Sequence, residues 1–116
     1  MEIEFYCKVY VNLEVELDGI KAVMSDIFNA KFEGRTICYG ILAIDLFKNK
    51  DTSSYSASVD RAVYWPYYLE VEPIDDASIH ADEFVGAIAT LLERFRTIGI
   101  QVVPSCDFEE RLVAVD

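Results

Sequence analysis

The first seventeen residues alternate between apolar side chains and side chains that are polar, charged or tyrosine. One set of positions contains apolar residues and cysteine: Ile3, Phe5, Cys7, Val9, Val11, Leu13, Val15 and Leu17. The positions between them contain Glu2, Glu4, Tyr6, Lys8, Tyr10, Asn12, Glu14 and Glu16. A period of two places neighbouring side chains on opposite faces of a β-strand. The segment therefore predicts a strand with one buried face and one acidic, tyrosine-bearing face in water.

A second segment, residues 61–72, combines tyrosine and glutamate in the same way. Its apolar face is predicted to contain Val63, Trp65, Tyr67, Leu69 and Val71. Its polar face is predicted to contain Tyr64, Tyr68, Glu70 and Glu72. Pro66 has no N–H to donate, which indicates a bulge or a break in strand pairing there. Two strands thus contribute to one negatively charged aromatic surface.

The rest of the chain predicts two helices and two further strands. Asp18 is expected to cap a helix that runs to about residue 30, with apolar residues at helical spacing: Ile20, Val23, Met24, Ile27 and Phe28. A second helix begins at His80 and ends before Gly99, with an apolar stripe of Phe84, Ile88, Leu91, Leu92, Phe95 and Ile98. Residues 35–47 and 100–103 predict strands. Residues 48–60 predict a mobile connection, and residues 107–116 predict either a turn of helix or a further strand.

These elements follow one another in the order β-α-β-β-α-β, which is the order of the ferredoxin-like plait. We therefore predict an α+β fold of one domain, residues 1–116, with an antiparallel sheet and two helices on one face. The expected strand order is 4-1-3-2. A chain of 116 residues is long enough to bury a core without disulfides. The other sheet face then stays open, with the first and third strands at its centre.

The open face is predicted to be a protein-binding surface made of Glu4, Tyr6, Tyr10, Tyr64, Tyr68, Glu70 and Glu72. In the expected register the facing pairs are Tyr6 with Tyr68, Tyr10 with Tyr64, and Glu4 with Glu70; a shift by two residues brings Glu4 to Glu72. Tyr39 and Phe47 join this face if the inward set is Cys38, Leu42, Ile44 and Leu46. Facing aromatic pairs stabilise a sheet by about 0.2–1 kcal/mol each, whereas facing like charges cost a similar amount. The stability of the sheet therefore explains why tyrosines lie on this face, but it does not explain the glutamates.

The alternative interpretation is that both residue types only keep an open sheet face soluble.

The net charge of −11, from 10 basic and 21 acidic residues, narrows the class of partner. This charge repels the phosphates of nucleic acids and of anionic membrane surfaces, so neither is expected as a partner. It favours a basic protein. The amino terminus lacks the basic and apolar regions of a signal peptide, which predicts a cytoplasmic protein.

No catalytic residue, cofactor or metal site is predicted. The turn at residues 16–19 is acidic, which disfavours the phosphate-binding loop that plait enzymes such as acylphosphatases carry after their first strand. An enzyme remains an alternative only if His80, Asp82 and Cys106 converge in a cleft. The three cysteines are an odd number with wide spacing. They predict reduced core residues, because Cys7 and Cys38 fall within apolar strand patterns.

In its small size, strong acidity and expected single plait-like domain, the chain resembles the immunity proteins that bacteria pair with secreted toxins. The resemblance implies a non-enzymatic protein that binds one basic partner, such as a toxin nuclease domain, and blocks its active site. The rival interpretation is a ligand-sensing or structural plait domain that dimerises through its sheet face or holds a small cationic molecule. Facing glutamates would oppose such a dimer, so we expect a monomer or a weak homodimer.

Overall fold

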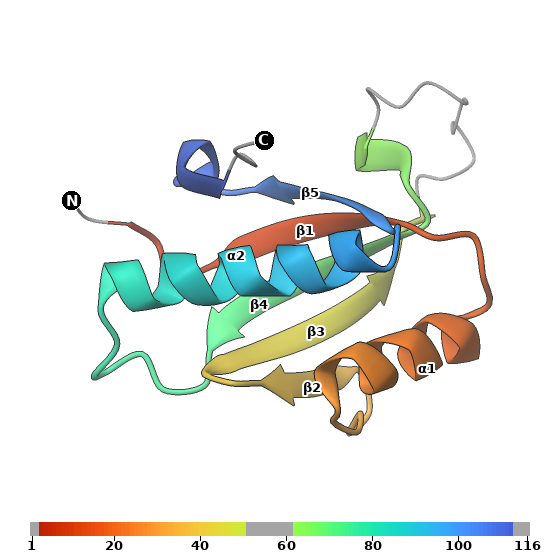
Figure 1. Ribbon diagram of the computed structural model, residues 1–116, viewed down its shortest axis with the longest axis horizontal. Helices are drawn as coiled ribbons and strands as arrows, with labels where there is room; N and C mark the ends of the chain where they lie inside the picture. The colour runs from red at the N-terminus through yellow and green to blue at the C-terminus, as the bar shows by residue number, and fades with distance from the viewer. Residues whose placement is uncertain (1–2, 51–61, 113–116) are drawn as a thin grey trace.

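The described part of the chain forms an open antiparallel sheet of five strands that carries two α-helices (Figure 1). We describe residues 3–50 and 62–112 of the computed structural model. The central strand β1 (Cys7–Asn12) lies between β4 (Tyr67–Pro73) and β5 (Gln101–Ser105). Next to β4 comes β3 (Leu42–Lys48), and β2 (Thr36–Tyr39) forms the edge. The predicted α+β class and antiparallel sheet are confirmed, with one strand more than expected.

The additional strand arises because residues 35–47 form a hairpin rather than the single strand that we predicted. Gly40 adopts a φ of 59° in a two-residue turn between Tyr39 and Leu42, which are paired across β2 and β3. A two-residue hairpin favours positive φ at its first turn position, and glycine adopts that conformation without steric cost. The apolar composition was correctly interpreted as β structure, but the glycine divides it in two.

The first strand is shorter than its alternating pattern. β1 ends at Asn12 because β4 begins opposite Val11 and β5 begins opposite Asn12, so the following residues have no strand to pair with. Val15 and Leu17, predicted to be buried, are 41% and 43% exposed. An alternating pattern identifies a face, whereas hydrogen-bonded neighbours decide how far a strand extends.

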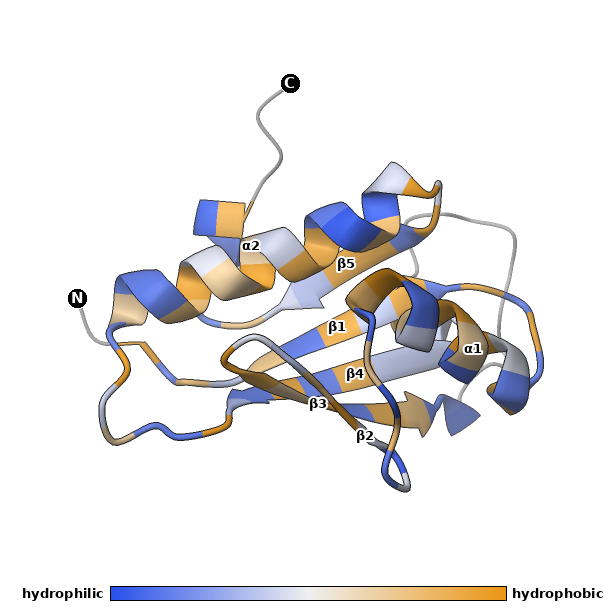
Figure 2. Cartoon of the chain, turned by 60° about the horizontal axis from the view of Figure 1, so that its bottom comes forward, coloured by the Kyte–Doolittle hydropathy of each residue, from blue (hydrophilic) through white to orange (hydrophobic). Residues whose placement is uncertain are grey.

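Both helices lie on the same face of the sheet, as predicted (Figures 1 and 2). The helix α1 (Leu17–Phe28) begins one residue before Asp18, which lies in its first turn and does not cap it. The helix α2 (Ala81–Thr97) matches its prediction, and Gly99 follows it with a φ of 84°. Its stripe is buried except for Ile98, which is 50% exposed beyond the helix end. No α-helix of the described residues covers the opposite face of the sheet.

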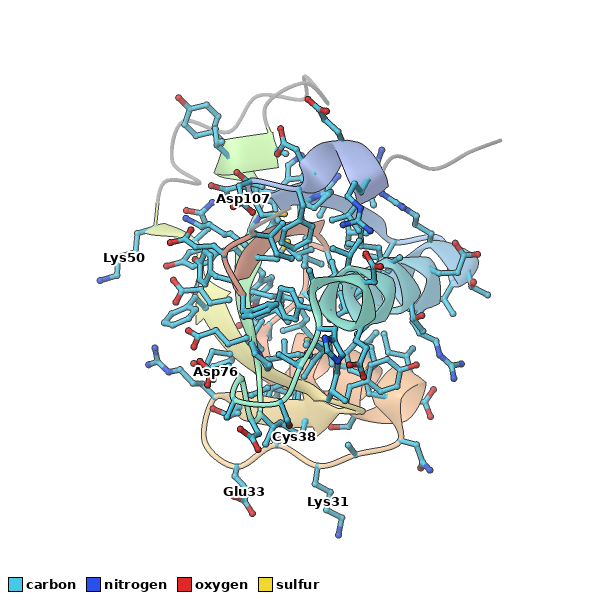
Figure 3. All side chains as sticks on the ribbon, turned by 90° about the vertical axis from the view of Figure 1, so that its left-hand side faces the viewer. Lys31, Glu33, Cys38, Lys50, Asp76 and Asp107 are labelled. Carbon is cyan, nitrogen blue, oxygen red and sulfur yellow. The ribbon has the colours of Figure 1, made fainter. Side chains whose placement is uncertain are left out.

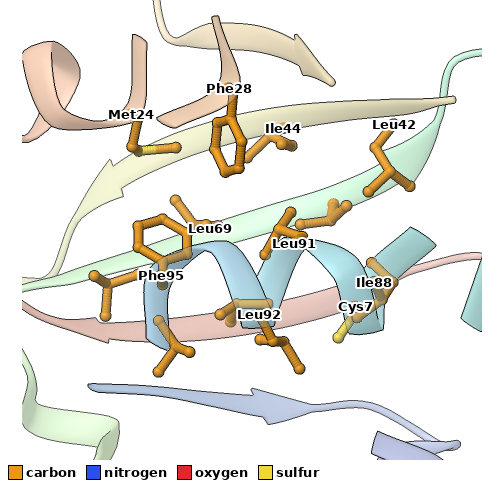
Figure 4. Packing of buried hydrophobic residues seen from close by; sticks show 14 of the residues in the cluster. Cys7, Met24, Phe28, Leu42, Ile44, Leu69, Ile88, Leu91, Leu92 and Phe95 are labelled. Carbon is orange, nitrogen blue, oxygen red and sulfur yellow. The ribbon is translucent and has the colours of Figure 1, made fainter. Parts of the chain in front are cut away.

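The core lies between the helices and the sheet (Figure 4). Phe28 of α1 and Phe95 of α2 meet edge to face, with ring centroids 5.7 Å apart. Inward residues of the strands complete the core, among them Cys7, Val9, Val11, Ile37, Leu42, Ile44, Leu46, Leu69 and Val71. Each large apolar side chain contributes about 1.5–3 kcal/mol when it is fully buried. This packing fixes which strand face remains available for binding.

The third predicted strand begins later than expected. Residues Ala62–Tyr64 form the 3₁₀ turn η2, and β4 starts only after Pro66, where the sequence indicated a break. Val63 is therefore 50% exposed instead of buried. The buried amide of Asn49 holds the turn by donating to the carbonyls of Val63 and Trp65 at 2.7 and 2.8 Å.

The predicted connection, residues 48–60, and the tail, residues 107–116, are only partly described. Most of the predicted connection, residues 51–60, lies outside the described residues. In the tail, Glu109–Leu112 form the 3₁₀ turn η3, which agrees with the helical alternative for those residues. Residues 113–116 lie outside the described residues.

Candidate protein-binding surface

A row of aromatic rings crosses three neighbouring strands on the open face of the sheet. Tyr68 of β4 is paired with Phe47 of β3 on one side and with Tyr10 of β1 on the other. The rings of Phe47 and Tyr68 are stacked, with centroids 5.1 Å apart and planes 12° from parallel. The centroids of Tyr10 and Tyr68 are 6.3 Å apart. We call these three residues the aromatic row; all three are half-buried, so each ring still presents surface to a partner.

Three carboxylates lie beside the aromatic row, toward the C-terminal end of β4. Asp45 and Glu70 are direct partners in the pairing of β3 with β4, and Glu72 follows Glu70 on the same face. We call these three residues the acidic cluster. The hydroxyl of Thr36 donates to Asp45 Oδ1 at 2.5 Å. Facing like charges destabilise a sheet, so the cluster is not explained by the stability of the fold.

Two cations lie over the aromatic row rather than against the acidic cluster. The Lys8 ammonium lies 4.3 Å from the ring centroid of Tyr68 and 5.1 Å from that of Tyr10. The guanidinium of Arg35 lies 4.6 Å from the ring centroid of Phe47. A cation over an aromatic face is attracted by the ring quadrupole at such distances. The open face is thus polarised, with carboxylates at one end and cations over the rings.

The predicted strand register is wrong by four residues. Paired residues of β1 and β4 have numbers that sum to 78, as in Cys7 with Val71, whereas we predicted a sum of 74. Tyr10 therefore faces Tyr68, and Lys8 faces Glu70. The shift follows from the late start of β4, because residues 62–64 form a turn and are not available for pairing.

Tyr6 and Glu4 precede β1 and do not face the residues that we predicted for them. Burial, followed by the negative charge of Glu70, raises the pKa of Tyr6 to about 12; Glu72 adds to this effect. Tyr6 therefore lies within the electrostatic influence of the acidic cluster. Glu4 is exposed, and its backbone N–H donates to Asp107 Oδ2 at 3.0 Å.

One tyrosine that we assigned to the open sheet face, and one that we placed there only if Cys38 points inward, lie elsewhere. Tyr64 is a half-buried residue of the turn η2 rather than a strand residue opposite Tyr10. Tyr39 packs on the helix side, with its ring centroid 4.7 Å from that of Phe28, and its hydroxyl accepts a hydrogen bond from Arg94 Nε at 3.1 Å. Phe47 does lie on the open face. The hairpin explains the difference, because its turn sets the faces of β2 and β3 independently.

The sequence interpretation omitted Asp45 and Arg35 from this surface. Asp45 lies two residues before Phe47 and so shares its face, a signal that the sequence contained. The position of Arg35 had no such signal, because it depends on the return of the hairpin to Leu46, whose N–H donates to the Arg35 carbonyl at 2.9 Å.

The cysteines are all free, but they do not all belong to the core. Cys7 is fully buried, and its sulfur lies 3.2 Å from the sulfur of the half-buried Cys106. Burial raises the pKa of both thiols. Cys38 is exposed, contrary to our prediction, because it is paired with Ala43 while Ile37 points inward.

The residues of the enzymatic alternative each have a structural contact of their own. His80 precedes α2, and its backbone N–H donates to Glu83 Oε1 at 3.2 Å. Asp82 forms an ion pair with Arg111 at 2.7 Å, and this contact lowers the pKa of Asp82. Within the described ranges, no group of three or more metal-ligating side chains converges. No helix among residues 3–50 and 62–112 has the length and apolar character needed to cross a membrane.

Comparison with protein-family models, with curated proteins and with solved structures finds no match to this chain.

Proposed function

We propose that the chain is a protein-binding module that neutralises or regulates a basic protein through the acidic cluster and the aromatic row. The observation that carries the proposal is the position of the acidic cluster directly beside a half-exposed aromatic row, on a sheet face that no helix of residues 3–50 and 62–112 covers (Figure 2). Such a module resembles an immunity protein in its chemistry, with carboxylates that occupy a basic groove in place of phosphates.

Electrostatic support for the proposal comes from the repulsion between Asp45 and Glu70, which face each other across β3 and β4. Carboxylates facing one another repel, and a lysine- or arginine-rich surface would relieve that repulsion on binding. The net charge of −11 adds a long-range attraction that accelerates encounter with a cationic partner. Glu72, which is exposed, extends this charge toward the end of the sheet.

The aromatic row supports the proposal through its composition and rigidity. Tyrosine is enriched at interfaces because it combines a large apolar ring with a hydrogen-bonding hydroxyl group and few rotatable bonds. The stacking of Tyr68 on Phe47 holds these rings in place before a partner arrives. These side chains therefore lose little conformational entropy when a partner packs against them.

We propose further that the fold is a ferredoxin-like plait in which a hairpin replaces the second strand. Support comes from the strand neighbours β5, β1, β4 and β3, which follow the order 4-1-3-2 when β3 is counted as the second strand. The short β2 then extends the sheet at its edge.

Photo-crosslinking in cells tests the proposed surface. A photoreactive phenylalanine at position 68 is expected to capture a protein of net positive charge, while the same residue at the exposed position 89 on α2 captures none. Capture of the same proteins from both positions, or of an acidic protein from position 68, contradicts the proposal.

Charge reversal then tests the acidic cluster against the captured partner. The variant Glu70→Lys with Glu72→Lys is expected to slow association at low salt, with a smaller effect as salt screens the charges. The control Asp26→Lys with Glu93→Lys makes the same change in net charge on exposed positions of the two helices. Equal association rates for the two variants would remove the cluster from the interface.

Size-exclusion chromatography separates this proposal from a dimeric plait domain. We expect the isolated chain to elute as a monomer or a weak homodimer. A stable dimer that Tyr68→Ala converts to a monomer would assign the aromatic row to self-association instead.

A further inference from the structure

A cavity of about 940 Å³ opens at the opposite end of the sheet from the acidic cluster. It lies where β3 ends, between the turn that precedes β2 and the first two turns of α1. Five basic side chains of the described residues line it: Lys8, Lys21, Arg35, Lys48 and Lys50. These are half of the ten lysine and arginine residues of the chain and include four of its five lysines. No aspartate or glutamate is found among the described residues that line the cavity.

This charge distribution is opposite to that of the whole protein, which carries a net charge of −11. Within the described parts of the chain, none of the five basic groups forms an ion pair. The ion pair found there joins Arg111 to Asp82. Concentrated cations without paired carboxylates repel one another. An anion that enters the cavity would relieve that repulsion.

Contacts with neutral groups hold three of the cations in position. The Lys21 ammonium donates to the carbonyl of Gly34 at 2.9 Å. Lys8 and Arg35 lie over the rings of Tyr68 and Phe47, at 4.3 and 4.6 Å from the centroids. These contacts orient the cations without neutralising them. Lys50 extends outward on the side of the sheet away from the helices (Figure 3).

Aromatic rings form another wall of the same cavity. Tyr10, Phe47 and Tyr68, the three members of the aromatic row, line it together with the cations. A planar ring of a ligand can pack edge to face against such residues while its charged group lies among the lysines. The volume is within the range of small-molecule sites, about 300–1,000 Å³.

From the five cations, which form no ion pair with any described residue, and from the adjoining aromatic row, we infer that this cavity binds a phosphorylated ligand with a planar ring, of the size of a mononucleotide. The phosphates lie among Lys21, Arg35 and Lys48, and the ring packs against the aromatic row. The inference does not depend on the proposed basic protein partner: the phosphates contact the cations and that partner contacts the acidic cluster, although both use the aromatic row. It also differs from the phosphate-binding loop that the acidic turn at residues 16–19 disfavours, because Glu16 and Asp18 do not line the cavity.

Calorimetric titration of the full chain with ATP, inorganic triphosphate and adenosine, in metal-free buffer, tests each part of the inference. We expect ATP to bind about tenfold more tightly than triphosphate, and adenosine to bind more weakly than either, because the site uses both charge and packing against the aromatic row. Added salt should weaken ATP binding. Absence of ATP binding at millimolar concentration overturns the inference.

Two variants separate the roles of charge and ring. Lys48→Gln is expected to weaken ATP binding about tenfold, whereas the control Lys31→Gln, which removes an exposed lysine outside the cavity, leaves it unchanged. Phe47→Leu should abolish the preference for ATP over triphosphate and retain triphosphate binding. Equal losses from the two lysine variants indicate nonspecific attraction and contradict the inference. Binding of a single-stranded oligonucleotide without binding of ATP also contradicts it.

Discussion

Lys8 lies directly opposite Glu70 in the pairing of β1 with β4, yet its ammonium group is placed over the ring of Tyr68, 4.3 Å from the centroid. Lys8 is therefore the boundary of the polarised face. It separates the acidic cluster from the basic cavity and also lines that cavity. One short stretch of β1 thus contributes to two surfaces of opposite charge.

The contact between Lys8 and Tyr68 is expected to stabilise the fold measurably. A double-mutant cycle with Lys8→Met, which keeps the alkyl stem, and Tyr68→Leu should give a coupling free energy of about 0.5–1 kcal/mol in urea unfolding. The parallel cycle of Lys31→Met with Tyr68→Leu is the control and should give none. Equal coupling in both cycles would show that the contact has no energetic role.

The hairpin that divides the predicted second strand depends on Gly40. Gly40→Ala should destabilise the protein by about 1 kcal/mol, because its φ of 59° is unfavourable for alanine while no atom lies within 4 Å of the added Cβ. Gly86→Ala in α2 also meets no atom, but it should stabilise by about 0.5–1 kcal/mol because alanine favours the helix. Changes of the same sign in chemical denaturation would contradict this account.

Asn49 is expected to be important for stability although it lies next to a connection between strands. Asn49→Ala removes the donors to the carbonyls of Val63 and Trp65 in a buried site, which should cost about 1–3 kcal/mol of unfolding free energy. The control Asn12→Ala removes one exposed hydrogen bond to Gln101 and should cost less than about 0.5 kcal/mol. Similar midpoints for the two variants would argue against the role of Asn49.

The raised pKa of Tyr6 predicts a loss of stability at alkaline pH. Burial and the charge of Glu70 raise the pKa of Tyr6 from 10.0 to about 12. The contribution of Tyr6 to the free energy of unfolding is therefore complete below pH 10 and is lost as the pH rises through about 12. We expect the stability of the wild type to fall more steeply with pH in this range than that of Tyr6→Phe. Urea unfolding at a series of pH values measures the difference, and parallel curves would refute the assignment.

The exposed Cys38 should react with thiol reagents before the other two cysteines. Cys7 is buried, and burial raises the pKa of both Cys7 and Cys106, which lowers the fraction of reactive thiolate. Peptide mass spectrometry after brief alkylation should find the label on Cys38, and Cys38→Ser should remove the fast phase. Labelling of Cys7 at the same rate would contradict the burial of its side chain.

The parts of the fold that the sequence predicted well depend on local patterns. The stripe of α2 and the glycine that follows it identified this helix, because both signals lie within the helix itself. Alternation likewise identified the faces of β1 and β4, so Tyr10, Tyr68 and Glu70 were assigned correctly to one open face. The register and the position of Tyr64 were predicted wrongly, because they depend on where β4 begins. The condition for Tyr39 on this face, an inward Cys38, is not met because of how the hairpin turns.

By itself, the sequence determined that the strands have one buried face and one acidic, aromatic face. It also determined that two helices cover the buried face. Both follow from hydrophobic periodicity, which is a local property of the chain. Only the tertiary structure decided which charges meet. It placed Asp45 opposite Glu70, and it brought Lys21, Arg35 and Lys48 from three separate segments to one cavity. Strand pairing joins residues that are distant in the chain, so no local pattern contains this arrangement. The polar residues of the alternating amino-terminal segment therefore belong to a polarised surface rather than to a uniformly acidic face.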